Sequence, residues 1–209
     1  PPPPPEDTRA SYSLAGERVD VYTNGEDGCL AAIGTEVWDA ALLLCESLPG
    51  APPPGRVLEL GSGAGLAGCF LKKRGADVTL TDYNPAVLRL LRKSAGLVGA
   101  RVLTLDWYRR ETWGEEGAYD SLVGAALVYS PDHACVADVI KHCLRRGGEA
   151  TLLQLSVRPG VAEFLRRCED VGLGVEERRV DEGAVERAGE ARGEIAGAED
   201  FRIYTIKHI

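Results

Sequence analysis

Hydrophobic and polar positions along the chain follow two periods, and their order predicts a parallel α/β sheet. Short apolar runs with a period of two are typical of strands, and longer amphipathic runs between them are typical of helices. After a short strand at 18–22, the predicted strands cover residues 56–60, 77–81, 100–105, 119–129, 149–155, 175–180 and 201–206. The predicted helices cover residues 37–48, 65–74, 85–96, 131–146 and 161–171.

The two ends of the chain depart from this alternation. Pro1–Pro5 can join neither a helix nor a sheet, so residues 1–16 are predicted to form a flexible Pro-rich tail before a single domain at 17–209. Residues 181–200 are rich in Glu, Gly, Ala and Arg, which predicts a solvated loop or a marginal helix. The last two strands then form a hairpin. The expected fold is Rossmann-like: a seven-stranded, mostly parallel sheet with an antiparallel edge strand and helices on both faces.

Composition and charge narrow the classes of function. A net charge of -8 argues against a broad phosphate-binding face, so we expect no nucleic-acid partner and favour a basic protein segment. The chain contains no apolar run of about 18 residues, so we expect no membrane partner. The cysteines occur singly, without a C-x-x-C pair, and His133 and His142 lack the spacing of a metal pair. These features predict a monomer without a metal, with reduced thiols, in the cytoplasm or nucleus, and solvated or capping roles for the histidines.

The stretch LELGSGAGLAG at 58–68 places a glycine-rich turn between a strand and a helix. Such a turn offers backbone amides at the carboxyl edge of the sheet, beside the positive end of a helix. Gly61, Gly63 and Gly65 lack a Cβ, so an adenosine-bearing ligand can lie against the backbone. Gly63, Gly65 and Gly68 also satisfy G-x-G-x-x-G, the fingerprint of NAD-binding proteins. The turn alone therefore leaves NAD and S-adenosylmethionine open, besides a role in close packing.

Side chains at the strand ends discriminate between these ligands. Asp82 ends the second strand of the sheet, where a carboxylate can accept both hydroxyls of a ribose or cap the next helix. Glu59 precedes the turn and can accept hydrogen bonds from the ammonium of S-adenosylmethionine, but it would repel a pyrophosphate. Asp106 and Trp107 offer a carboxylate and an aromatic face to an adenine, unless Trp107 is a core residue. The set favours a ligand without phosphates.

Five motifs in order resemble the seven-β-strand S-adenosylmethionine-dependent methyltransferases, and among them the protein-lysine methyltransferases of methyltransferase-like family 16. The motifs are GTEVWDAA at 34–41, LELGSGAG at 58–65, TDYN at 81–84, LDW at 105–107 and GAALVY at 124–129. The resemblance covers residues 17 to 180. It implies S-adenosylmethionine as cofactor and a protein substrate, in this group a lysine of a chaperone or an elongation factor.

The resemblance also implies the site. The residues expected at the cofactor are Trp38, Glu59, Gly61, Ser62, Gly63, Asp82, Tyr83, Asp106, Trp107 and Ala125. Trp38 would lie near the methionine end, Asp82 would hold the ribose, and Trp107 would flank the adenine. Tyr129 is the expected catalytic residue, at the border of the acceptor channel.

One position departs from the family pattern. Members carry an acidic residue three positions before the tyrosine, as D-x-x-Y or E-x-x-Y, and this chain has Ala126. A carboxylate there can orient an acceptor ammonium or help it lose its proton, because the neutral amine is the nucleophile. Several interpretations stay open: a substitute carboxylate such as Asp132, a different side chain as acceptor, a small-molecule substrate, or a silent homologue that acts as an interaction module.

Overall fold

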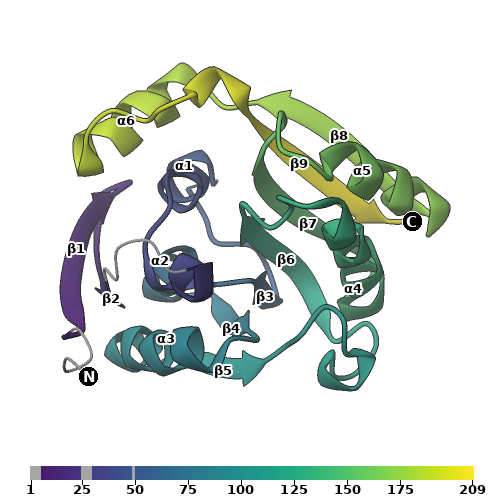
Figure 1. Cartoon of the computed structure of the whole chain (residues 1–209), viewed down its shortest axis with the longest axis horizontal. Coiled ribbons are helices and arrows are strands. Elements are labelled where there is room, and N and C mark those ends of the chain that lie inside the picture. Colours follow the sequence, from purple (N-terminus) through teal and green to yellow (C-terminus); the bar gives the residue numbers. More distant parts are fainter. Residues whose placement is uncertain (1–5, 25–29, 49) are drawn as a thin grey trace.

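The computed structural model describes residues 6–24, 30–48 and 50–209, and its centre is a seven-stranded sheet (Figure 1). The strand order is β5-β4-β3-β6-β7-β9-β8. The parallel strands are β3 (Arg56–Leu60), β4 (Asp77–Asp82), β5 (Arg101–Thr104), β6 (Tyr119–Ala125) and β7 (Leu144–Leu155). β9 (Phe201–His208) runs antiparallel to both β7 and the edge strand β8 (Leu173–Arg179). The predicted fold class is confirmed.

Helices cover both faces of the sheet (Figure 1). One face carries α1 (Asp39–Ser47), α2 (Leu66–Lys73) and α3 (Pro85–Val98), and the other carries α4 (Val136–Cys143) and α5 (Val161–Asp170). Because strand side chains alternate between faces, β3 contributes to two cores. Val57 belongs to the core beneath α1 and α2, whereas Leu58 and Leu60 belong to the core beneath α4 and α5.

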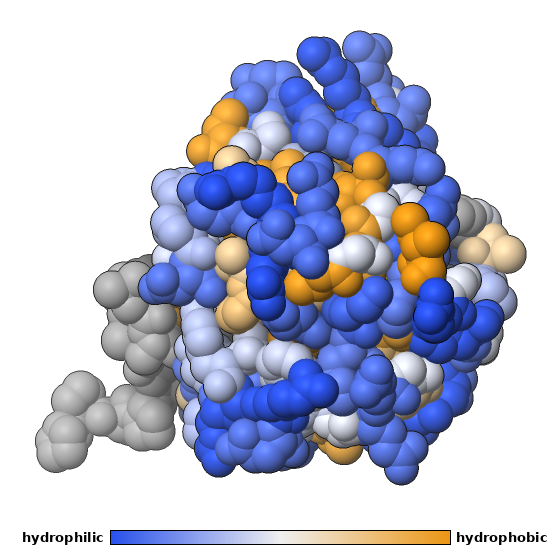
Figure 2. Space-filling view, turned by 90° about the vertical axis from the view of Figure 1, so that its right-hand side faces the viewer, coloured by the Kyte–Doolittle hydropathy of each residue, from blue (hydrophilic) through white to orange (hydrophobic). Residues whose placement is uncertain are grey.

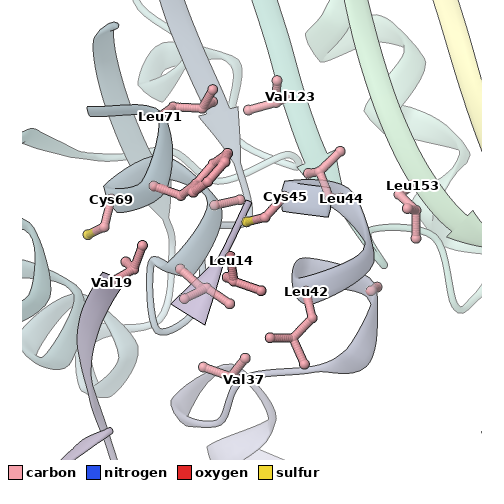
Figure 3. Close-up of a cluster of buried hydrophobic side chains, with 14 of the residues drawn as sticks. Leu14, Val19, Val37, Leu42, Leu44, Cys45, Cys69, Leu71, Val123 and Leu153 are labelled. Carbon is pink, nitrogen blue, oxygen red and sulfur yellow. The ribbon is translucent and has the colours of Figure 1, made fainter. Parts of the chain in front are cut away.

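Regular structure begins before Glu17, so the prediction of a flexible tail over residues 1–16 was wrong for residues 8–14. Thr8–Leu14 forms β1, which pairs with β2 (Glu17–Thr23) in a separate antiparallel sheet. Leu14 and Val19 from this hairpin join the core that α1 and α2 line (Figure 3). The pattern of β1 was weak because Leu14 is its one fully buried position. Pro1–Pro5 lie outside the described residues.

The segment between β8 and β9 contains a helix, α6 (Glu182–Arg192), so the marginal helix is the correct alternative to the loop. Its buried side chains are Ala184 and Ala188, which let α6 pack closely on α1. Arg187 donates to the buried carboxylate of Glu46 on α1, with an Nε to Oε2 distance of 2.8 Å. Alanine gives a weak hydrophobic pattern, and this explains why the sequence did not distinguish a helix from a loop.

The predicted helix at 131–146 is shorter than expected. A 3-10 turn, η3 (Pro131–Cys135), leads into α4, which ends at Cys143, and β7 starts at Leu144. Arg145 therefore lies in a strand, where it forms an ion pair with Asp120 at 2.6 Å. The register of β7 with β6 is irregular in this part, with a shift between Tyr119 and Ser121 of β6.

The face that carries α4 and α5 is mostly hydrophilic, with a few hydrophobic residues between the polar ones (Figure 2). None of the helices in the described ranges is long and apolar enough to cross a membrane.

Candidate active site

A cavity of about 630 Å³ lies at the carboxyl ends of β3, β4 and β6. The chain leaves β3 toward β4 on one side, and β6 pairs on the other side of β3. At such a switch point the loops diverge and leave a crevice. Every residue that the sequence predicts for the site lines this cavity, and the set comprises Trp38, Glu59, Gly61, Ser62, Gly63, Asp82, Tyr83, Asp106, Trp107, Ala125 and Tyr129.

The glycines of the turn pack closely against their neighbours, so a Cβ at Gly61 or Gly63 would be crowded. Gly61 and Gly63 have φ values of 55° and 54°, a region that favours glycine. A Cβ on Gly63 would lie 3.1 Å from the carbonyl oxygen of Gly34. The amide of Ser62 donates to Thr81 of β4 at 2.7 Å. The backbone itself therefore forms this wall of the cavity.

Asp82 joins the two loops that follow β3 and β4. Its Oδ2 accepts from the amide of Gly63 at 3.2 Å, and its Oδ1 accepts from the amides of Tyr83 and Asn84 at 2.8 and 3.0 Å. Burial raises the pKa of Asp82, and the three amide donors oppose that shift. Asn84, not Asp82, caps α3 through the amide of Ala86, so the capping interpretation of Asp82 was wrong.

Glu59 is a buried carboxylate with an unused oxygen. Burial raises its pKa to about 7 and the nearby charge of Asp82 acts in the same direction, while the adjacent Ser62 hydroxyl and Gly68 amide oppose the shift. Among the described residues, no group forms a hydrogen bond with Oε2. The thiols of Cys45 and Cys69 lie close to Glu59, and its charge raises their pKa values. Because thiols carry no positive charge, they do not neutralise the carboxylate. A buried unsatisfied carboxylate of this kind fits a cationic ligand group.

Aromatic side chains surround the mouth of the cavity. Trp38, Tyr83, Tyr108 and Tyr129 all line it, and between 44% and 62% of each residue is exposed. The indole of Trp38 is fixed by a 2.7 Å hydrogen bond from Nε1 to the carbonyl of Ile33. Exposed aromatic rings gathered at one opening are typical of a binding surface.

His133 and Gln154 are among the residues that line the cavity although the sequence did not predict them there. His133 was expected to be solvated or capping, but it is 9% exposed and lies edge-on to Trp107 and Tyr129, with ring centroids 5.4 and 4.2 Å apart. Gln154 on β7 bonds to both backbone groups of Val128, accepting at 3.0 Å and donating to the carbonyl. A lone amide within an apolar strand was the available signal for Gln154.

Ala126 lines the cavity in an unusual backbone conformation. Its φ is 53°, and its amide donates to the carbonyl of Leu153 at 2.8 Å. Non-glycine residues rarely adopt this left-handed region, and Asp and Asn adopt it several times more often than others. Asp132, the suggested substitute carboxylate, is not among the residues that line the cavity, whereas Glu36 is.

Gly160 supports the loop that carries Tyr129. A Cβ at Gly160 would lie 2.1 Å from the carbonyl oxygen of Ser130, and its φ is 93°. We expect Gly160→Ala to lower the free energy of unfolding by about 2–4 kcal/mol, through left-handed strain and overpacking. Gly75→Ala is the matched control, since Gly75 has a φ of 92° and open space around it. Urea denaturation of both variants measures the free energy of unfolding. If Gly75→Ala and Gly160→Ala lose the same amount, the clash with Ser130 is relieved by a shift of the backbone.

The glycine turn, the buried carboxylates Glu59 and Asp82 beside it and the seven-stranded sheet together are typical of an S-adenosylmethionine-dependent methyltransferase. Solved structures with this fold include a TehB-like S-adenosylmethionine-dependent methyltransferase from Corynebacterium glutamicum, with a TM-score of 0.59 and 24% identity over 86% of this chain and 92% of that one. P. horikoshii TYW2 in complex with MeSAdo has a TM-score of 0.60 and 13% identity, covering 96% of this chain and 71% of that one. At these identities the likeness shows the fold.

The sequence relatives identify the family. The family described as lysine methyltransferase matches residues 22–167, so the chain belongs to it. Protein N-lysine methyltransferase METTL21A of Danio rerio is 31% identical, over 71% of this chain and 71% of its own length. EEF1A lysine methyltransferase 3 of Mus musculus is 30% identical, over 75% of this chain and 70% of its own length. The resemblance drawn from the motifs is confirmed, as is S-adenosylmethionine as the cofactor.

Proposed function

We propose that this protein methylates a lysine side chain of another protein and that the aromatic mouth of the cavity receives that side chain. The observation that carries the proposal is the group of exposed rings, Trp38, Tyr83, Tyr108 and Tyr129, on a cavity that the buried carboxylates Glu59 and Asp82 also line. Aromatic faces attract an ammonium, and they also pack on the alkyl stem of a lysine. Family membership supports the same acceptor.

The floor of the cavity suits the cofactor. When bound, the cofactor supplies a methyl group on a sulfonium, which a neutral amine can take. Glu59 would accept hydrogen bonds from its ammonium through the unpartnered Oε2. Asp82 would hold the ribose while keeping the amide of Gly63 in place. Gly61 and Ser62 continue that wall on the same side.

The remaining residues would contact the adenine and the methionine end. Trp107 presents its ring to the cavity, and the side chain of Asp106 accepts from the amide of Tyr108 at 2.9 Å, which orients the carboxylate. Ala125 would contribute its backbone at the end of β6. Trp38 would lie near the methionine end, opposite Tyr129. Each assignment is testable by binding of S-adenosylhomocysteine.

Glu59 gives a pH-dependent prediction. With a pKa of about 7, Glu59 is half protonated at pH 7, so a cationic ligand group that ionises it fully should release about 0.5 protons on binding. Binding therefore strengthens as the pH rises from 6 to 8. Titration calorimetry of S-adenosylhomocysteine in two buffers with different ionisation enthalpies measures the release. We expect Glu59→Gln to abolish this proton release. An unchanged release in Glu59→Gln would show that Glu59 does not contact the ligand.

We further propose a basic protein segment as substrate. The whole chain carries a net charge of -8, and the exposed side chain of Glu36 lines the cavity. Negative charge near the opening favours lysine-rich segments. A monomer in the cytoplasm or nucleus, with reduced thiols, is the setting that we propose for this activity.

Transfer of labelled methyl groups tests the function. We would incubate the protein with methyl-tritiated S-adenosylmethionine and, separately, EEF1A, calmodulin and a whole-cell protein extract, then hydrolyse labelled protein for amino-acid analysis. EEF1A and calmodulin are named in the relatives, including a calmodulin-lysine N-methyltransferase of Arabidopsis thaliana that is 26% identical over 62% of this chain and 46% of its own length. We expect methyl-lysine.

Two variants and a control link that label to the mouth of the cavity. Tyr129→Phe and Trp38→Ala should each lower the rate by about 10-fold or more, because a misplaced acceptor loses orientation. Tyr22→Phe, outside the cavity, should not. Label found only in small molecules would favour the alternative substrate class. Cofactor binding without any label would favour a silent interaction module, for which Ala126 is the motivation.

A further inference from the structure

His133 is a titratable side chain of the cavity that the proposed function does not use. It comes from η3, directly after the loop that carries Tyr129, and its ring contacts those of Tyr129 and Trp107 at nearly right angles, 88° and 80°. The residue is 9% exposed and lines the cavity. It therefore stands between the ring expected at the acceptor and the ring expected at the adenine.

The hydrogen bonds of the ring favour one tautomer. Nδ1 lies 3.1 Å from the carbonyl oxygen of Leu127, a distance at which an N–H donates. The amide of Tyr129 is farther from Nδ1, at 3.4 Å, and would need the other tautomer. With the proton on Nδ1, the lone pair is on Nε2, and no group in the described part of the chain bonds to Nε2.

The carboxylates of the cavity are committed elsewhere or are placed differently. Asp82 accepts from three backbone amides, and Asp39 lies beside Arg192. Glu59 is buried beneath the glycine turn, on the cofactor side. Asp106 accepts from the amide of Tyr108, and Glu36 is exposed at the mouth, so these two carboxylates are the remaining competitors.

We propose that Nε2 of His133 accepts the proton of the acceptor lysine, the task that a carboxylate at position 126 would otherwise perform. This inference rests on the proposed function. In the step, an N–H bond of the ammonium breaks, its electron pair stays on the amine nitrogen, and an Nε2–H bond forms. The proton then leaves the imidazolium to water. The amine is thereby neutral, as a nucleophile must be.

The surroundings of His133 suit this task. Burial lowers its pKa, while the Leu127 carbonyl and Asp132 oppose that shift. Other titratable groups nearby include Tyr129, Tyr108 and, acting on Cys135 of the same turn, Asp106 and Asp138. A neutral imidazole is a proton acceptor at neutral pH. Carboxylates around it stabilise the imidazolium once the proton arrives.

The first test needs no substrate. Proton-nitrogen NMR of protein labelled with ¹⁵N-histidine reports the tautomer and the titration of each ring, and His133→Asn and His142→Asn assign the signals. We expect His133 to carry its proton on Nδ1 and to titrate below the ordinary range of histidine. A proton on Nε2, or a charged ring at pH 7, would overturn the proposal.

The second test uses the labelled-methyl assay with an acceptor found for the wild-type protein. His133→Asn keeps a donor for Leu127 but lacks the second ring nitrogen, so we expect unchanged S-adenosylhomocysteine affinity and a kcat about 100-fold lower at pH 7. The acidic limb of the kcat profile should also disappear. His142→Asn is the matched control, since His142 also lies beside a tryptophan and bonds a backbone carbonyl, that of Gly114, outside the cavity.

The outcomes separate this inference from the proposed function. If Glu36→Gln removes the acidic limb and His133→Asn does not, the exposed glutamate is the proton acceptor and the proposal for His133 is wrong. Imidazole added to His133→Ala should restore part of the lost methylation rate. If imidazole restores none of it and His133→Asn has the kcat of the wild type, the proposal for His133 is also wrong. If the wild-type protein labels no protein, the proposed function itself fails.

Discussion

Asp82→Ala should lower the affinity for S-adenosylhomocysteine by at least about 100-fold, because two charge-assisted hydrogen bonds to the ribose contribute about 1.5–3 kcal/mol each. The structure adds a second reason. Asp82 also accepts from the amides of Gly63, Tyr83 and Asn84, so its loss frees both loops that wall the cavity. Titration calorimetry on the purified protein measures the change.

Two control variants separate the ribose contact from the support of the loops. Asp82→Asn keeps one acceptor oxygen for the amides but has no charge, so we expect its affinity between those of the wild type and Asp82→Ala. Asp77→Asn removes a carboxylate from the exposed, opposite end of β4 and should leave binding unchanged. If Asp82→Ala binds S-adenosylhomocysteine normally, the assignment of the ribose to Asp82 is wrong.

The sequence predicted the parallel part of the fold because each element there has a strong local signal. β3 is a short, mostly apolar run, RVLEL, followed by a glycine-rich turn, and α3 begins with Asn84-Pro85, a cap and a first-turn proline. β1 and α6 lack such signals. β1 buries few of its residues, and α6 contacts α1 through alanines, so both are stabilised by partners distant in sequence.

The same distinction explains the site. Glu59, Asp82 and Asp106 end or follow strands of one parallel sheet, so the order of strands alone brings them to one edge. Gln154 lies near the carboxyl end of the parallel strand β7 and reaches the same edge, whereas His133 reaches the cavity through tertiary contacts from a turn after the acceptor loop. Their roles depend on where the backbone of residues 127–129 lies, and no local pattern encodes that position.

Ala126→Asp should raise the methylation rate of this protein by about 10-fold or more, because a carboxylate would then face the acceptor where the family carries one. The backbone already has the left-handed conformation, with a φ of 53°, that Asp adopts more readily than Ala. The change should therefore not lower the free energy of unfolding. Ala126→Asn is the control, since it shares the backbone preference but cannot take a proton. An equal gain with Asn would point to orientation instead of proton transfer.

The double variant connects this position with His133. If the two groups perform the same task, His133→Asn should cost about 100-fold in the wild-type background but less than about 10-fold in the Ala126→Asp background, because the introduced carboxylate then takes the proton. Independent roles would instead give equal losses in both backgrounds. A double-mutant cycle on kcat measures the coupling directly. Strong coupling would mean that the chain retains lysine chemistry with an imidazole in place of the missing carboxylate.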